Sequence, residues 1–156
     1  RLDELKKFLG YFERDYGYHV ALIVTAYDNE TYNKDLEPYA ALSTTLGPAT
    51  AKVGVNYAWK QDALGGDDNV YLYSDLGSGV PGTPVSLNAH LGYTSGALSP
   101  NRLTMTSADG GFDYSVGASV NVTKNLSVGA SYIGVDGDSY DGFSDDTVVA
   151  SVKLAF

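Results

Sequence analysis

The stretch Phe112–Val122 (FDYSVGASVNV) decides the fold class. Apolar residues occupy every second position, and small or polar residues occupy the positions between them. A period of two places these two kinds of residue on opposite faces of a β-strand. Similar alternation, in places less strict, recurs over 18–27, 37–46, 50–59, 69–77, 85–94, 126–134 and 147–156. The sequence therefore predicts an all-β protein with about eight antiparallel strands in up-and-down order.

Composition excludes several classes of protein. The 156 residues contain no Cys, so a disulfide scaffold and a Cys-ligated zinc site are both excluded. Lys and Arg number 10 against 19 Asp and Glu, and this excess of acid argues against nucleic acid as a partner. The longest apolar run is Val20–Val24, far shorter than the ~18–20 residues of a membrane-spanning helix.

The alternation has two interpretations. The apolar face points inward in a soluble barrel or sandwich, whereas it points to lipid in a transmembrane barrel. The cores of the predicted strands, which leave out Glu37 at the start of 37–46, contain only four charged residues. All four lie in the polar alternation: Lys52, Asp75, Asp113 and Lys153. The rest of that alternation is mostly Gly, Ser, Asn and Ala, which suits the inside of a narrow barrel. We therefore expect a transmembrane β-barrel over 18–156, with a soluble β-barrel as the alternative.

The expected connections alternate between long and short. Long ones are expected at 28–36, 60–68, 95–111 and 135–145, and short ones at 47–48, 78–83 and 123–124. Bacterial outer-membrane barrels have short periplasmic turns and longer extracellular loops. Most of the acidic residues fall in the long connections, so these predict an acidic outer rim that could bind ions or partners.

Aromatic residues and the chain end support the same interpretation. Five aromatic residues near the long-connection ends of the strands predict an interfacial belt: Tyr27, Trp59, Tyr93, Tyr114 and Tyr132. The last strand alternates apolar residues up to the final Phe: Val148, Ala150, Val152, Leu154 and Phe156. This pattern resembles the C-terminal targeting strand of Gram-negative outer-membrane proteins. It implies the barrel-assembly machinery and outer-membrane lipid as partners, and the bacterial outer membrane as the location.

Four phrases also resemble a family of proteobacterial outer-membrane proteins, the TorF-type porins. They are Glu37–Leu46 (EPYAALSTTL), Gly47–Tyr57 (GPATAKVGVNY), Asp67–Tyr73 (DDNVYLY) and Gly82–Thr94 (GTPVSLNAHLGYT). The resemblance covers about residues 37–156 and implies an outer-membrane barrel with a pore. Members of that family extend further at the N-terminus, so it also implies that this chain is the C-terminal portion of a larger barrel.

The polar alternation supplies the candidate functional residues. Eight of them are expected to line the lumen: Lys52, Asn56, Asp75, Asn88, His90, Asp113, Asn121 and Lys153. In a pore they would set charge selectivity, and in a closed eight-stranded barrel they would form a bonded interior network. The prediction is a porin for passive diffusion of small solutes. The alternative is a closed structural or adhesion barrel with acidic extracellular loops that bind ions or partners.

No catalytic residues, metal site or cofactor are expected. Residues 136–142 place only two Asp at the spacing of a calcium loop, and His90 has no Ser or Asp at a catalytic spacing. Residues 1–17 form a separate N-terminal segment, either a short helix with Leu2, Leu5, Leu9 and Phe12 on one face or a worn strand. The sequence does not fix the oligomeric state.

Overall fold

The computed structural model describes residues 18–29, 32–100, 105, 110–136 and 145–155. These residues form eight strands and one 3-10 turn, η1 (Asp62–Leu64). The strands are β1 (Tyr18–Asn29), β2 (Tyr32–Leu46), β3 (Ala49–Gln61), β4 (Asp67–Gly79), β5 (Val85–Gly96), β6 (Gly111–Asn121), β7 (Leu126–Asp136) and β8 (Thr147–Leu154). The all-β prediction with eight strands is confirmed.

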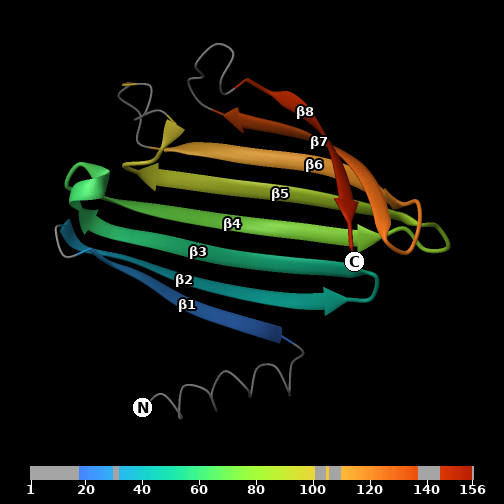
Figure 1. Ribbon diagram of the computed structural model, residues 1–156, viewed down its shortest axis with the longest axis horizontal. Coiled ribbons are helices and arrows are strands. Elements are labelled where there is room, and N and C mark those ends of the chain that lie inside the picture. The colour runs from blue at the N-terminus through green and yellow to red at the C-terminus, as the bar shows by residue number, and fades with distance from the viewer. Residues whose placement is uncertain (1–17, 30–31, 101–104, 106–109, 137–144, 156) are drawn as a thin grey trace.

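The strands make a single antiparallel sheet in which sequence neighbours are also spatial neighbours, in the order β1 to β8. Figure 1 shows them side by side in one twisted layer, with the β2–β3, β4–β5 and β6–β7 connections at the same end. The up-and-down topology is therefore confirmed. β1 and β8 are the outer strands, and the described residues do not close the sheet into a barrel.

The apolar alternation of this sheet is exposed and no apolar core forms among the described residues. The only buried hydrophobic residues there are Ala41 and Ala58. By contrast, Leu87 is 49% exposed, Val116 59% and Val152 70%. A soluble chain of this length would bury such side chains, because removing apolar surface from water is the main stabilising term in folding. The sheet therefore presents a large apolar surface to whatever surrounds it.

The connections differ from the expected lengths at one end of the sheet. β1 ends at Asn29 and β2 begins at Tyr32, so the long connection predicted for 28–36 is wrong. Strands also extend to Gln61 and from Asp67, which leaves only η1 and Gly65–Gly66 between β3 and β4. Gly65 ends η1 with φ +69°, a left-handed conformation that glycine adopts without strain. Only the β5–β6 and β7–β8 connections are long, and the length asymmetry comes from those two.

Two predictions fall outside the described residues. The helix or worn strand expected over 1–17 is one of them, and Phe156 at the end of the expected targeting strand is the other. Residues 147–154 form the last strand, β8, which pairs Val148 with Tyr132, Ala150 with Ala130, and Val152 with Val128. Among the described residues, no helix has the length and apolar character needed to cross a membrane.

Candidate functional site

The residues predicted to line a lumen all fall on one face of the sheet. Register connects them strand by strand: Lys52 of β3 lies opposite Asp75 of β4, and Asp75 lies opposite His90 of β5. The set in this alternation is Lys52, Asn56, Asp75, Asn88, His90, Asp113, Asn121 and Lys153. The structure joins Asp75, His90 and Asp113 by direct contacts. Asn88, Asn121 and Lys153 lie toward the β4–β5 and β6–β7 turns and are exposed.

Sequence reasoning missed three tyrosines on this polar face. Tyr39 of β2 lies opposite Asn56, and Asn56 lies opposite Tyr71 of β4, so all three share one alternation. Tyr73 follows two residues after Tyr71 and precedes Asp75 by two. The signal was present in the sequence, because Tyr71 and Tyr73 alternate with Val70 and Leu72.

Each of the two β4 tyrosines lies across a neighbouring strand at a glycine. Tyr73 reaches over β3 at Gly54, and its hydroxyl is 2.7 Å from the hydroxyl of Tyr39 on β2. Tyr71 reaches over β5 at Gly92 and donates a hydrogen bond of 3.1 Å to Asp113 Oδ1 on β6. A Cβ at either glycine would overlap the tyrosine ring or hydroxyl. The glycines therefore permit bonds between strands that are not neighbours in the sheet.

His90 is at the centre of the resulting cluster. Its Nδ1 lies 2.5 Å from Asp75 Oδ1, and its Nε2 lies 3.0 Å from Asp113 Oδ1 and 2.8 Å from the Tyr71 hydroxyl. The imidazole ring also stacks against Tyr71 and Tyr73, at interplanar angles of 28° and 24°. Both ring nitrogens are thus held by oxygen atoms, which fixes the orientation of the ring.

Lys52 extends the cluster toward β2. Its ammonium lies 4.9 Å from the ring centroid of Tyr73 and 5.6 Å from that of Tyr39. At these distances a cation is attracted to the negative face of an aromatic ring. We call the whole cluster the polar layer, and it spans β2 to β6: Tyr39, Lys52, Tyr71, Tyr73, Asp75, His90 and Asp113.

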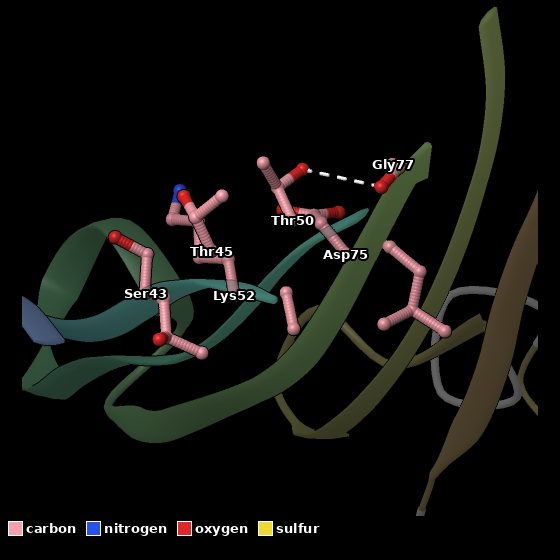
Figure 2. A pocket seen from close by; sticks show the side chains of 9 residues that line it. Ser43, Thr45, Thr50, Lys52, Asp75 and Gly77 are labelled. Atoms are coloured by element: carbon pink, nitrogen blue, oxygen red, sulfur yellow. Dashed lines mark hydrogen bonds between the residues drawn. The ribbon is translucent and has the colours of Figure 1, made fainter. Parts of the chain in front are cut away.

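Hollows lie on either side of the polar layer. One of about 350 Å³ lies toward the β2–β3 and β4–β5 turns, where Lys52 and Asp75 form part of its lining. Figure 2 shows the hydroxyl side chains of Ser43, Thr45 and Thr50 around it, with a 3.4 Å bond from Thr50 Oγ1 to the Gly77 carbonyl. The other, of about 280 Å³, lies toward the opposite end of the sheet and is lined by Asn56, Asn69 and Tyr71 among others. The polar layer therefore separates two water-accessible spaces on the same face.

Four of the five predicted belt residues lie in the apolar alternation. Trp59 packs edge-on against Tyr57, Tyr93 tilts against Phe112, and Tyr114 tilts against Tyr132. Three of them lie toward the end of the sheet where the β5–β6 and β7–β8 connections are found: Trp59, Tyr93 and Tyr114. Tyr132 lies opposite Val116, near the middle of β6 and β7. Tyr27 pairs with Asp35 in the register of β1 and β2, and its side chain is outside what the structure describes.

Two belt tyrosines converge on a carboxylate just before β8. The Tyr132 and Tyr114 hydroxyls both donate to Asp146 Oδ2, the latter over 3.0 Å. These hydrogen bonds stabilise the ionised carboxylate, and they lower the pKa of Asp146 below its ordinary value of 3.8. The contact fixes the junction between the β7–β8 connection and the last strand.

Residues 6–156 match the model of a bacterial protein family of unknown function, Gcw_chp. The chain belongs to that family. No curated protein and no solved structure matches it. Membership of Gcw_chp indicates a bacterial protein and assigns no activity.

Proposed function

We propose that this Gcw_chp protein is an outer-membrane β-barrel that lets small solutes diffuse through its lumen. One observation carries the proposal: the apolar alternation is exposed across β2 to β8, while the polar alternation carries a bonded layer of charged and aromatic side chains. A contiguous apolar surface of that extent indicates contact with lipid or protein rather than water. A lipid surround accounts for both faces at once, because a transmembrane barrel is apolar outside and polar inside.

Closure of the sheet follows from the same proposal. Within hydrocarbon, each unpaired backbone N–H or C=O group costs several kcal/mol, so a spanning sheet has to be closed. β1 and β8 run antiparallel to each other because an even number of strands alternates between them. We propose that these two outer strands are joined in the membrane, either directly or through further strands.

Disulfide cross-linking tests direct closure. The chain has no Cys, so a pair introduced at Ala21 of β1 and at Val149, Ser151 or Lys153 of β8 would be the only thiols present. Direct pairing predicts a disulfide within one chain for one of these β8 positions and weak or no bonding for the others. Cross-links between chains would point to closure by a second copy. No cross-link at any position would contradict direct pairing.

The location rests on the last strand and the aromatic belt. β8 presents Val148, Ala150, Val152 and Leu154 in one alternation, as the targeting strand of an outer-membrane protein does. The predicted belt residues of β3, β5 and β6 gather toward one end, which is where aromatic rings concentrate at a membrane interface. The resemblance to TorF-type porins supports the same location. Cell fractionation tests it: the protein should enter the outer-membrane fraction, and recovery in the soluble fraction would overturn the proposal.

The pore part of the proposal rests on the two hollows. Hollows of about 350 and 280 Å³ lie on the two sides of the polar layer, and we propose that both belong to the lumen. The polar layer would then be the narrowest section of the lumen. Planar-bilayer recording of purified protein should show unitary conductance steps. Truncating a layer side chain, Tyr73→Ala, should raise the step size, whereas Leu72→Ala on the apolar face should leave it unchanged.

A specific observation favours a closed barrel as the second candidate. Hydrogen bonds connect the polar layer from β2 to β6. One of 2.7 Å joins β2 to β4, and one of 2.5 Å joins β4 to β5. Two more reach β6, one of 3.1 Å from β4 and one of 3.0 Å from β5. Such a network could seal the lumen and leave the acidic connections as the functional surface. The same recordings decide between the two, because a membrane-inserted protein with no conductance at any voltage removes the porin and leaves the closed barrel.

A further inference from the structure

We propose that the polar layer holds a transition-metal ion, with His90 Nε2, Asp113 Oδ1 and Tyr71 Oη as its ligands. The site does not depend on solute passage, because it requires only the observed arrangement of β4, β5 and β6. These three atoms form a triangle whose edges are 2.8 Å (Tyr71 to His90), 3.0 Å (His90 to Asp113) and 3.1 Å (Tyr71 to Asp113). The three ligands come from three adjacent strands.

The dimensions of the triangle fit one face of an octahedral site. Metal–ligand bonds of about 2.0–2.1 Å at right angles place neighbouring ligand atoms about 2.9 Å apart. A tetrahedral site with the same bonds needs edges of about 3.3 Å, longer than any edge observed. The geometry therefore favours an ion that accepts octahedral coordination, with three further positions open to water or solute.

The donor set narrows the class of ion. One imidazole nitrogen with a carboxylate and a phenol oxygen suits first-row transition ions, since imidazole is a poor ligand for calcium and magnesium. Two anionic oxygen ligands, the Asp113 carboxylate and the phenolate that Tyr71 would become on binding, favour a trivalent ion of this series. Ferric iron meets both conditions, and coordination would release the phenolic proton of Tyr71 to solvent.

Asp75 supplies the outer support that metal-binding histidines require. Its Oδ1 lies 2.5 Å from His90 Nδ1, on the side of the ring opposite the triangle. A carboxylate in this place keeps the proton on Nδ1, directs the Nε2 lone pair toward the metal and raises its basicity. In the structure His90 Nε2 lies within hydrogen-bonding distance of Asp113 Oδ1, at 3.0 Å, and the Tyr71 hydroxyl donates to the same oxygen over 3.1 Å, so a bound ion would replace these hydrogen bonds.

The tyrosine explains why acidic and histidine residues alone do not reveal the site. Among the described residues, no three His, Cys, Asp or Glu side chains could hold a metal ion together. Asp75 and Asp113 lie on opposite nitrogens of His90, so these three cannot converge on one point. Tyr71 supplies the third ligand by lying over Gly92, where a Cβ would overlap its hydroxyl and the Asp113 carboxylate. His90 is 27% exposed and Asp113 34%, so an ion can enter from the polar face.

Absorbance titration of the folded protein in detergent with ferric nitrilotriacetate tests the site. Wild type should bind one equivalent and develop a visible phenolate-to-iron charge-transfer band. Tyr71→Phe should lose the band, whereas Tyr73→Phe, from the same layer but outside the triangle, should keep it. Asp75→Asn should weaken affinity by about 10-fold to 100-fold through loss of the outer contact.

The outcomes separate the proposals. No band in the wild type, or an equal band in Tyr71→Phe and wild type, overturns the metal site. Calorimetric titration of Asp113→Asn with Ni²⁺ gives a second test that needs no phenolate signal, and affinity equal to that of wild type would also overturn the site. Metal binding is measured without conductance, so a protein that binds iron and conducts nothing would refute only the porin.

Discussion

A charge placed on the apolar face at mid-strand gives the sharpest test of what surrounds the sheet. Val116 is the central residue of β6 (Gly111–Asn121) and is 59% exposed. If that face meets lipid, Val116→Arg places a guanidinium near the bilayer midplane. The expected loss of stability is about 2–4 kcal/mol, which is a fall of roughly 30-fold to 700-fold in the folding equilibrium. An exposed position on a soluble sheet would lose about 0.5 kcal/mol or less.

Val122 supplies the matched control, because it is also a valine and is 56% exposed. It follows Val116 by six residues and lies just past the end of β6. Six residues at about 3.3 Å each on a strand tilted about 40° place it roughly 15 Å further along the membrane normal. That distance exceeds half of the ~25 Å apolar band, so Val122→Arg should cost about 0–1 kcal/mol.

Denaturant unfolding in lipid vesicles measures both variants. The chain has one tryptophan, Trp59 on β3, so its fluorescence reports unfolding without added probes. The reasoning predicts that the two midpoints differ by the equivalent of at least about 1 kcal/mol, with Val116→Arg the less stable variant. Equal stabilities within about 0.5 kcal/mol would mean that the apolar face does not meet hydrocarbon at Val116.

Three further predictions concern contacts that hold the sheet. Gly92→Val places a side chain against Tyr71 and Asp113, so it should destabilise the fold by about 1–3 kcal/mol in the same unfolding assay. Gly79→Ala is the control and should be nearly neutral, because a Cβ there meets nothing within 4 Å. Tyr132→Phe removes a donor to Asp146 and should raise the pKa of that carboxyl toward 3.8, with Tyr93→Phe as the control in a ¹³C titration. The pKa of Asp146 is lower in the folded than in the unfolded state, so the ionised carboxylate stabilises the fold above pH ~4 and loses this effect as the pH falls through the lowered pKa. An Asp146 titration that is the same in Tyr132→Phe and wild type would contradict this account. Asn125 Nδ2 donates to the Ala155 carbonyl over 2.7 Å. Asn125→Ala should therefore speed amide exchange near the end of β8 and lower the stability of the fold by about 1 kcal/mol. Unchanged exchange there would show that the contact is not formed.

Strand positions were predictable because the period of two is a local property of the chain. The stretch Phe112–Val122 identified β6 to within a residue at each end, and the apolar and polar alternations carried over to the register of every strand pair from β2 to β8. The strand ends at 28–36 and 60–68 were not predictable in the same way. Asp, Asn and Lys there are typical of loops, and pairing with a neighbouring strand overrode that local preference.

Part of the candidate site was predictable, because residues of one alternation share a face. Lys52, Asp75, His90 and Asp113 were assigned to that face from the sequence alone. The sequence could not tell that Tyr71 and Tyr73 would lie across neighbouring strands, since this depends on where a glycine falls in the neighbouring strand. A glycine on the neighbouring strand leaves no pattern in the sequence around the tyrosine.

The sequence by itself determined the strands, their two alternations and the separation of apolar from polar residues, because each strand carries that information in its own side chains. Only the tertiary structure decided which atoms meet: the two nitrogens of His90 between Asp75 and Asp113, and Tyr71 beside Asp113 across β5. Register between strands places residues 15 to 42 positions apart within hydrogen-bonding distance, and no local pattern specifies such contacts.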